Sequence, residues 1–195
     1  MLDSFRDTFR LPDLKRRILF TLAALFVYRL GAHVPTPGVD AAALGKLFDQ
    51  GTLLGFLDLF AGGALSRFSI FALGVTPYIN SSIVMQLLAV VVPSIEKMQK
   101  EGEEGRKKIV QWTRYGTIVF AFIQAVGMTG WLRGLGIYSG GMLDIILVSL
   151  TLTTGAVAVM WLGEIMSDHG IGNGISLLIF AGIVVRIPEA IIRTV

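Results

Sequence analysis

The stretch "LFAGGALSRFSIFALGVTPYINSSIVMQLLAVVVP", Leu59 to Pro93, decides the fold of this chain. Its second half is apolar, as a membrane-spanning helix of about 20 residues must be. Its first half opens with a glycine pair and carries an arginine, and Gly74 and Pro77 interrupt the hydrophobic part. Irregular backbone at membrane depth is tolerated only where protein or a water-filled cavity surrounds it. The stretch therefore predicts a broken membrane helix, whose irregular part lies either at the membrane interface or against a cavity.

The overall composition supports a membrane protein. Of the 195 residues, 53% are hydrophobic and 16% are charged, whereas soluble domains have about 25% charged residues. The chain has no cysteine, which excludes disulfides and cysteine metal sites. The net charge of +3 fits either nucleic-acid binding or the positive loops of a membrane protein, so its distribution must decide.

Five apolar windows are long enough, or nearly so, to cross a bilayer. The fold class that they predict is an all-α integral membrane protein with five transmembrane helices. A "PTPG" turn marks the end of the first window, which also contains Arg29. The windows are Ile18–Val34, Phe68–Pro93, Ile109–Leu132, Leu143–Gly163 and Ile175–Ile192.

The basic residues lie mostly on one side of these spans. Of the 17 Lys and Arg residues, five lie in residues 1–17 and six in Ser94–Arg114. The positive-inside rule then places the N-terminus and the Ser94–Arg114 loop in the cytoplasm. Four glutamates neutralise the basic loop, so we expect no direct DNA binding. A solvated loop that fixes topology and a docking site for a cytoplasmic partner both stay open.

A short apolar run precedes the second span. It is too short to cross a bilayer and too apolar to lie alone in water, so it is either an interfacial helix or a re-entrant plug of a cavity. Gly62 and Gly63, together with Arg67, would form its hinge. The apolar residues of the run are Leu53, Leu54, Phe56, Leu57, Leu59 and Phe60.

Polar groups inside the spans are few. Gln86 and Gln124 each lie deep in a span, where an amide faces either another helix or a water path. The segment "DHGIGNGISLLIF", residues 168–180, lacks the spacing and the preceding strand of a dinucleotide loop. It predicts a tight turn between two spans, with a helix beginning close to Ile175.

No enzyme signature is present. The sequence contains neither G-x-S-x-G nor H-E-x-x-H, and it has only two histidines. We therefore expect no catalytic residue, cofactor or metal. From the residues alone, half of a protein channel, half of a secondary transporter built from inverted repeats, and an intramembrane enzyme stay open.

Four long motifs resemble the bacterial SecY family, the channel subunits of the Sec protein translocase. They are "LKRRILFTLAALFVYRLGAHVPTPGVD", "GGALSRFSIFALGVTPYINSSIVMQLL", "KEGEEGRKKIVQWTRYGT" and "MWLGEIMSDHGIGNGISLLIFAGIV". The resemblance implies a channel of ten helices in two pseudo-symmetric halves, of which this chain is similar to helices one to five. It implies a function in moving unfolded polypeptides across the membrane and membrane segments sideways into it.

The resemblance also implies roles for particular residues. The plug corresponds roughly to Thr52–Phe68 and includes Leu53, Phe56, Leu57 and Phe60, with Gly62, Gly63 and Arg67 at its hinge. An aliphatic pore ring corresponds to Val75, Ile79, Ile175 and Ile179, which form two pairs four residues apart. Gln86 and Gln124 become candidates for the polar lining of a lateral gate.

The partners that the resemblance implies are the SecE and SecG subunits, signal sequences, unfolded preproteins and membrane lipid. A SecA motor or a translating ribosome would approach the basic residues Arg106, Lys107 and Lys108 on the cytoplasmic face. The implied location is the bacterial plasma membrane. Because flexible aliphatic side chains can dewet a constriction, such a ring would hold back ions while a polypeptide passes.

Overall fold

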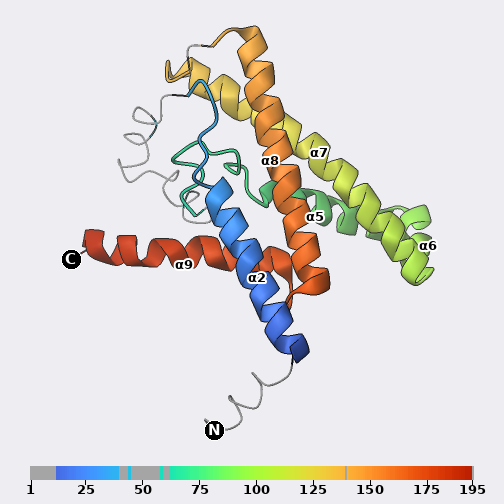
Figure 1. The fold of residues 1–195 in the computed structure, drawn as a ribbon. Helices are drawn as coiled ribbons and strands as arrows, with labels where there is room; N and C mark the ends of the chain where they lie inside the picture. The colour runs from blue at the N-terminus through green and yellow to red at the C-terminus, as the bar shows by residue number, and fades with distance from the viewer. Residues whose placement is uncertain (1–11, 40–43, 45–57, 59–61, 139, 195) are drawn as a thin grey trace.

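The computed structural model of the chain describes residues 12–39, 44, 58, 62–138 and 140–194 (Figure 1). The predicted plug residues Leu53, Phe56, Leu57 and Phe60 lie outside the described residues. Of the predicted plug and hinge, the described part is Asp58 and residues 62–68.

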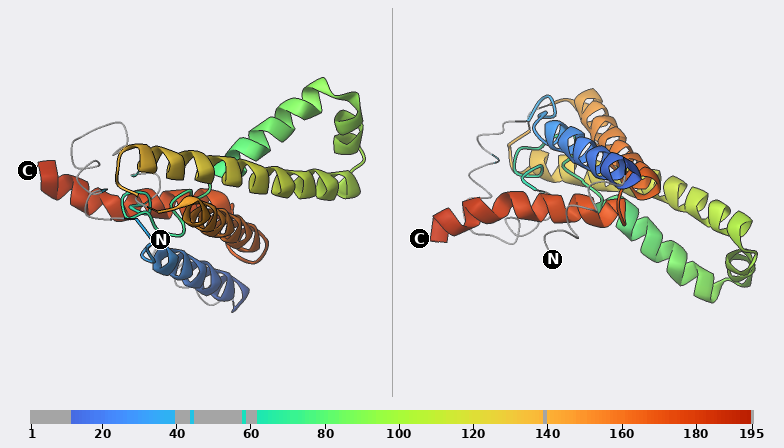
Figure 2. Two further views of the ribbon diagram at one scale, coloured as in Figure 1. Left: turned by 90° about the horizontal axis from the view of Figure 1, so that it is seen from above. Right: turned by 60° about the horizontal axis from the view of Figure 1, so that its bottom comes forward.

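The regular secondary structure of the described residues is entirely helical, and these residues contain no strand. The helix α8 lies between α2 and α7, and α9 crosses the central part of α2 and the C-terminal end of α8 at a steep angle (Figure 1). Seen from above, α5, α6 and the first part of α7 form the three sides of a triangle (Figure 2). The helices are α2 (Pro12–Gly31), α5 (Thr76–Val91), α6 (Pro93–Lys100), α7 (Glu103–Gly134), α8 (Met142–His169) and α9 (Gly174–Thr194).

The second predicted span is helical only in its later part. Residues 62–75 form successive turns, and α5 begins at Thr76 with Pro77 in its first turn. Gly62, Gly63 and Gly74 have positive φ angles of 62°, 84° and 52°, which side-chain-bearing residues rarely adopt. An isolated antiparallel bridge between Pro35 and Ser69 holds these turns beside the exit from α2. The break predicted from the sequence is therefore present and lies before Thr76.

The segment predicted as a loop between spans, Ser94–Arg114, is mostly helical. It consists of α6 and the first turns of α7, separated by Glu101 and Gly102. Gly102 has a φ of 79°, and the axis of α6 is bent by 102° from that of α5. The sequence interpretation left the secondary structure of this connection unassigned, and its helices fit the good helix propensity of Glu, Lys and Arg.

Small residues bring α7 and α8 together. Every fourth residue of α7 from Thr113 to Thr129 is buried, and all are Thr or Ala. Buried hydroxyls at Thr117 and Thr129 donate to the carbonyls four residues earlier, at 2.7 and 2.8 Å, so these two hydroxyls are satisfied within α7. Close approach of small residues is the usual way in which membrane helices associate.

Large apolar side chains point away from this core. Leu143 and Val90 are 82% and 83% exposed, and Phe26 and Trp161 are similarly uncovered. Such apolar surface indicates contact with lipid or with protein.

The apolar helices account for part of the predicted topology. Among the described residues, α7 and α8 are long and apolar enough to cross a membrane, and the bent pair α5 and α6 adds a third candidate. The apolar part of α9, Gly174–Val185, is shorter, and α2 carries four basic residues. The described residues thus contain two to three candidate spans by this measure, and the five-span arrangement remains a prediction.

Candidate functional site

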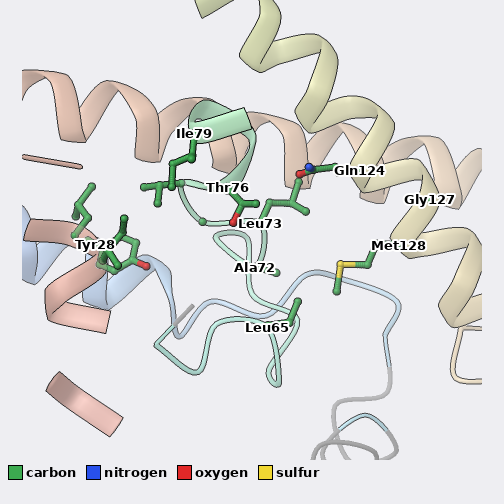
Figure 3. A pocket seen from close by; sticks show the side chains of 13 residues that line it. Tyr28, Leu65, Ala72, Leu73, Thr76, Ile79, Gln124, Gly127 and Met128 are labelled. Atoms are coloured by element: carbon green, nitrogen blue, oxygen red, sulfur yellow. The ribbon is translucent and has the colours of Figure 1, made fainter. Parts of the chain in front are cut away.

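An apolar cavity of about 510 Å³ lies where four helices and the turns before α5 meet. Tyr28 of α2 borders it on one side, and Gln124 and Met128 of α7 border it on the other (Figure 3). Ile79 of α5 lies near one end, and Leu65 of the turn lies near the other (Figure 3). Leu178 and Ile179 of α9 complete the wall.

Three of the four predicted ring residues line this cavity. They are Val75, Ile79 and Ile179, so the cavity joins α5 to α9 across a distance of 100 residues in sequence. Val75 caps α5, and its carbonyl accepts a hydrogen bond from the N–H of Ile79 at 3.1 Å. The prediction that these two residues share a face is therefore confirmed.

Ile175 is placed differently. Its side chain packs against Gly163 of α8, where an added Cβ would lie 3.2 Å from Ile175 Cγ1. It lines a second, more polar groove of about 460 Å³, which Ile79 and Ile179 also line. The four aliphatic residues thus surround two adjoining hollows rather than a single one.

A charged pair borders the polar groove. Arg114 of α7 and Glu164 of α8 form an ion pair, in which Nε donates a hydrogen bond to Oε1 at 3.0 Å and Nη2 lies 2.9 Å from Oε2. The Glu164 side chain is 13% exposed and that of Arg114 is 46% exposed. Tyr78, Ser82 and Asp168 line the same groove, which places polar groups directly beside the aliphatic ones.

The tight turn predicted at residues 168–180 is confirmed. The helix α8 ends at His169 and α9 begins at Gly174. Thr21 of α2 accepts a hydrogen bond from the N–H of Ile171 at 3.2 Å, and Arg17 donates to the carbonyl of Gly170 at 3.3 Å. The turn is therefore tied to α2, which sets the direction in which α9 leaves.

The two predicted gate residues lie in different surroundings. Gln124 is half-buried and borders the apolar cavity (Figure 3). Gln86 is exposed, and its amide donates to Ser82 Oγ at 3.2 Å within α5. The structure does not bring the two amides together at one cavity.

The basic residues Arg106, Lys107 and Lys108 are all exposed on the first turns of α7. The predicted hinge residues Gly62 and Gly63 are buried, and Arg67 is exposed on the same turn. Within the described residues, no group of three or more His, Cys, Asp or Glu side chains could hold a metal ion.

Sequence reasoning missed several residues that border the cavity. Leu178 follows Ile175 by three residues, so helical spacing alone could have placed both on one side of α9. Tyr28 stacks on Phe71 with ring centroids 5.9 Å apart. These residues are far apart in the sequence, so no local sequence pattern predicts the contact. Leu65 borders the cavity because of the turn geometry at residues 62–68.

Comparisons of the sequence with a family model and with curated proteins both identify SecY. The family model named SecY matches residues 69–195. The chain is 50% identical over 193 residues to the protein translocase subunit SecY of Escherichia coli K12, covering 95% of this chain and 43% of that relative. The corresponding subunit of Pseudomonas aeruginosa is 49% identical over 184 residues, with 93% and 42% covered. The chain thus spans less than half the length of these curated relatives.

Solved structures show a similar fold. Canine Sec61 in a ribosome–channel complex from the endoplasmic reticulum matches with a TM-score of 0.65 and 22% identity, covering 87% of this chain and 36% of the other. A structure described as a protein-conducting channel matches with the same values.

Proposed function

Because this chain belongs to the SecY family, we propose that it contributes the N-terminal part of a protein-conducting channel in a membrane. In this proposal the channel moves unfolded polypeptides across the bilayer and releases apolar segments sideways into it. The observation that carries the proposal is the apolar cavity between α5 and α9, which Val75, Ile79 and Ile179 line.

The chemistry of the cavity suits this task. Its walls are mostly apolar, with Thr76 and Gln124 among the few polar residues. Narrow apolar passages exclude water and ions by dewetting, while they offer no fixed charge to retain a passing polypeptide. A solute transporter would instead be expected to direct helix ends or charged groups at its ligand. The family membership and the apolar walls both favour the channel over the transporter.

The finer assignments follow from the same proposal. Val75, Ile79, Ile175 and Ile179 form half of a pore ring, five spans cross the membrane with the N-terminus in the cytoplasm, and the segment before Phe68 includes a re-entrant plug. In this proposal Gln124, which borders the apolar cavity, lines the lateral gate, whereas Gln86 would have to reach the gate from the exposed side of α5. Arg106, Lys107 and Lys108 are accessible to a SecA motor or a ribosome, and SecE and SecG would cover part of the outer surface.

A chimeric channel tests this proposal. The chain would replace the matching N-terminal part of the Escherichia coli relative, and the ring residues would be changed to glycine. We expect the chimera to support export of a preprotein, and the glycine variants to raise resting ion conductance in planar bilayers. Ile118→Gly and Ile123→Gly, on the outer surface of α7 at 42% and 61% exposure, provide matched controls.

Two outcomes would contradict the proposal. The first is a folded chimera that exports no preprotein. The second is a resting conductance that rises no more in the ring variants than in the two controls. Uptake of a labelled small solute by the chimera would instead favour the transporter.

A further inference from the structure

The turn at Gly62–Ser66 is held by a charged residue of α2. Arg29 lies inside the first predicted span, where ionisable side chains are rare and usually have a functional partner. Its Nη1 donates a hydrogen bond to the carbonyl oxygen of Gly62 at 2.8 Å. A cationic donor makes this a stronger bond than one between neutral groups.

A buried carboxylate holds the same turn from the other side. Asp58 is 1% exposed, and its Oδ1 accepts hydrogen bonds from the N–H groups of Leu65 and Ser66, at 3.1 and 2.9 Å. Its own carbonyl oxygen accepts from the N–H of Gly63 at 3.1 Å. Burial of a carboxylate is unfavourable unless hydrogen bonds offset the lost hydration, and these backbone donors supply that compensation.

The turn also packs tightly against α9. A Cβ added to Gly62 would lie 2.9 Å from the Cα of Gly182, so the two backbones are nearly in contact. Gly62 and Gly63 are both buried. A glycine pair that is bonded to α2, bonded to Asp58 and packed on α9 does not have the freedom that a hinge requires.

The held turn leads directly to the cavity. Asp58 bonds the N–H of Leu65, and the side chain of Leu65 lines the apolar cavity near the end opposite Ile79 (Figure 3). We propose that Arg29 and Asp58 are positioning residues that clamp the Gly62–Ser66 turn and so hold Leu65 as one end wall of the cavity. The turn is then a fixed anchor rather than the swinging hinge expected from its glycines. The consequence for ion retention rests on the proposed channel function, whereas the clamp itself does not.

A thiol reporter tests the clamp, because this chain has no native cysteine. Leu65→Cys would be introduced into the chimera described above, with the cysteines of the other part removed. Labelling by a membrane-impermeant maleimide then measures how often residue 65 leaves its packed position. We expect Asp58→Ala and Arg29→Met to raise the labelling rate about 10- to 100-fold, the range that the loss of charged hydrogen bonds implies.

Matched variants separate positioning from general damage. Asp58→Asn keeps an oxygen that can accept from both N–H groups, and Arg29→Lys keeps a cationic donor, so both should label within about threefold of the parent. Arg67→Met removes an exposed charge from the same turn and should leave the rate unchanged. If Asp58→Ala does not fold, Arg29→Met and Arg29→Lys still test the clamp, since they differ chiefly in the donor.

The results have distinct meanings. A labelling rate that is the same in Arg29→Met, Arg29→Lys and the parent would overturn the clamp. A raised rate that is accompanied by higher resting conductance supports both the clamp and the channel. A raised rate with unchanged conductance supports the clamp but removes the cavity from the ion path, and so contradicts the proposed function alone.

Discussion

Replacement of Gly155 by alanine is expected to destabilise the chain, although alanine is the better helix former. Gly155 is buried in the middle of α8, where the backbone of Ile70 rests on it. An added Cβ would overlap the carbonyl oxygen of Ile70 and lie 2.8 Å from its carbonyl carbon, whereas ordinary contact begins at 3.4 Å. The neighbour is backbone, so it cannot relieve the overlap by a rotamer change.

The size of the effect follows from two opposing contributions. Overpacking of this kind costs about 1–3 kcal/mol. Replacing glycine by alanine inside a helix stabilises the folded state by about 1 kcal/mol. We therefore expect Gly155→Ala to lower the free energy of unfolding by up to about 2 kcal/mol. Ile70 donates its N–H to the carbonyl of Val34 at 3.0 Å, so a displaced Ile70 would also strain the link to the exit from α2.

Unfolding of the purified chain by SDS in mixed micelles, followed by the fluorescence of its three tryptophans, measures this change. Gly130→Ala in α7 is the matched control, because a Cβ there meets no atom within 4 Å. It should leave the stability unchanged or raise it by up to about 1 kcal/mol. The reasoning fails if Gly155→Ala unfolds at the same SDS fraction as Gly130→Ala.

Three further predictions concern polar contacts. A double-mutant cycle on Arg114→Ala and Glu164→Gln should give a coupling of about 1 kcal/mol, since the pair is hydrogen-bonded but partly exposed; a coupling of zero in the SDS assay would contradict it. Ser81→Ala removes a buried 2.7 Å bond to the carbonyl of Thr113, which still accepts from another hydroxyl, so it should cost only about 1 kcal/mol in the same assay. Burial, reinforced by a nearby carboxylate, raises the pKa of Tyr138. The fold therefore favours the neutral phenol, and stability should fall as the pH rises above about 10. Tyr138→Phe should lessen that fall, and an identical alkaline profile for the two proteins would refute the assignment.

Local patterns predicted much of the helical framework. Hydropathy located α7 and α8, and the glycines at residues 170–174 predicted the turn between α8 and α9. The interrupted stretch before α5 was also predictable, because the backbone preferences of glycine and proline are intrinsic and do not depend on the rest of the chain. The helical nature of Ser94–Arg114 was missed, since a charged segment is compatible with either a helix or a coil.

The placement of the site depended on contacts between distant residues. Spacing paired Ile175 with Ile179, but only packing showed that Ile175 leans on Gly163 while Ile179 faces the apolar cavity. The sequence likewise marked Arg29 as a charge within an apolar span, yet its bond to Gly62 joins residues 33 positions apart.

The sequence by itself therefore determined which segments form apolar helices and where the backbone must bend, because hydropathy and backbone preference are local properties. Only the tertiary structure decided which aliphatic side chains meet at a cavity and which glycines are clamped. Those outcomes depend on how closely separate helices approach, and that distance is set by the small residues of one helix against the backbone of another.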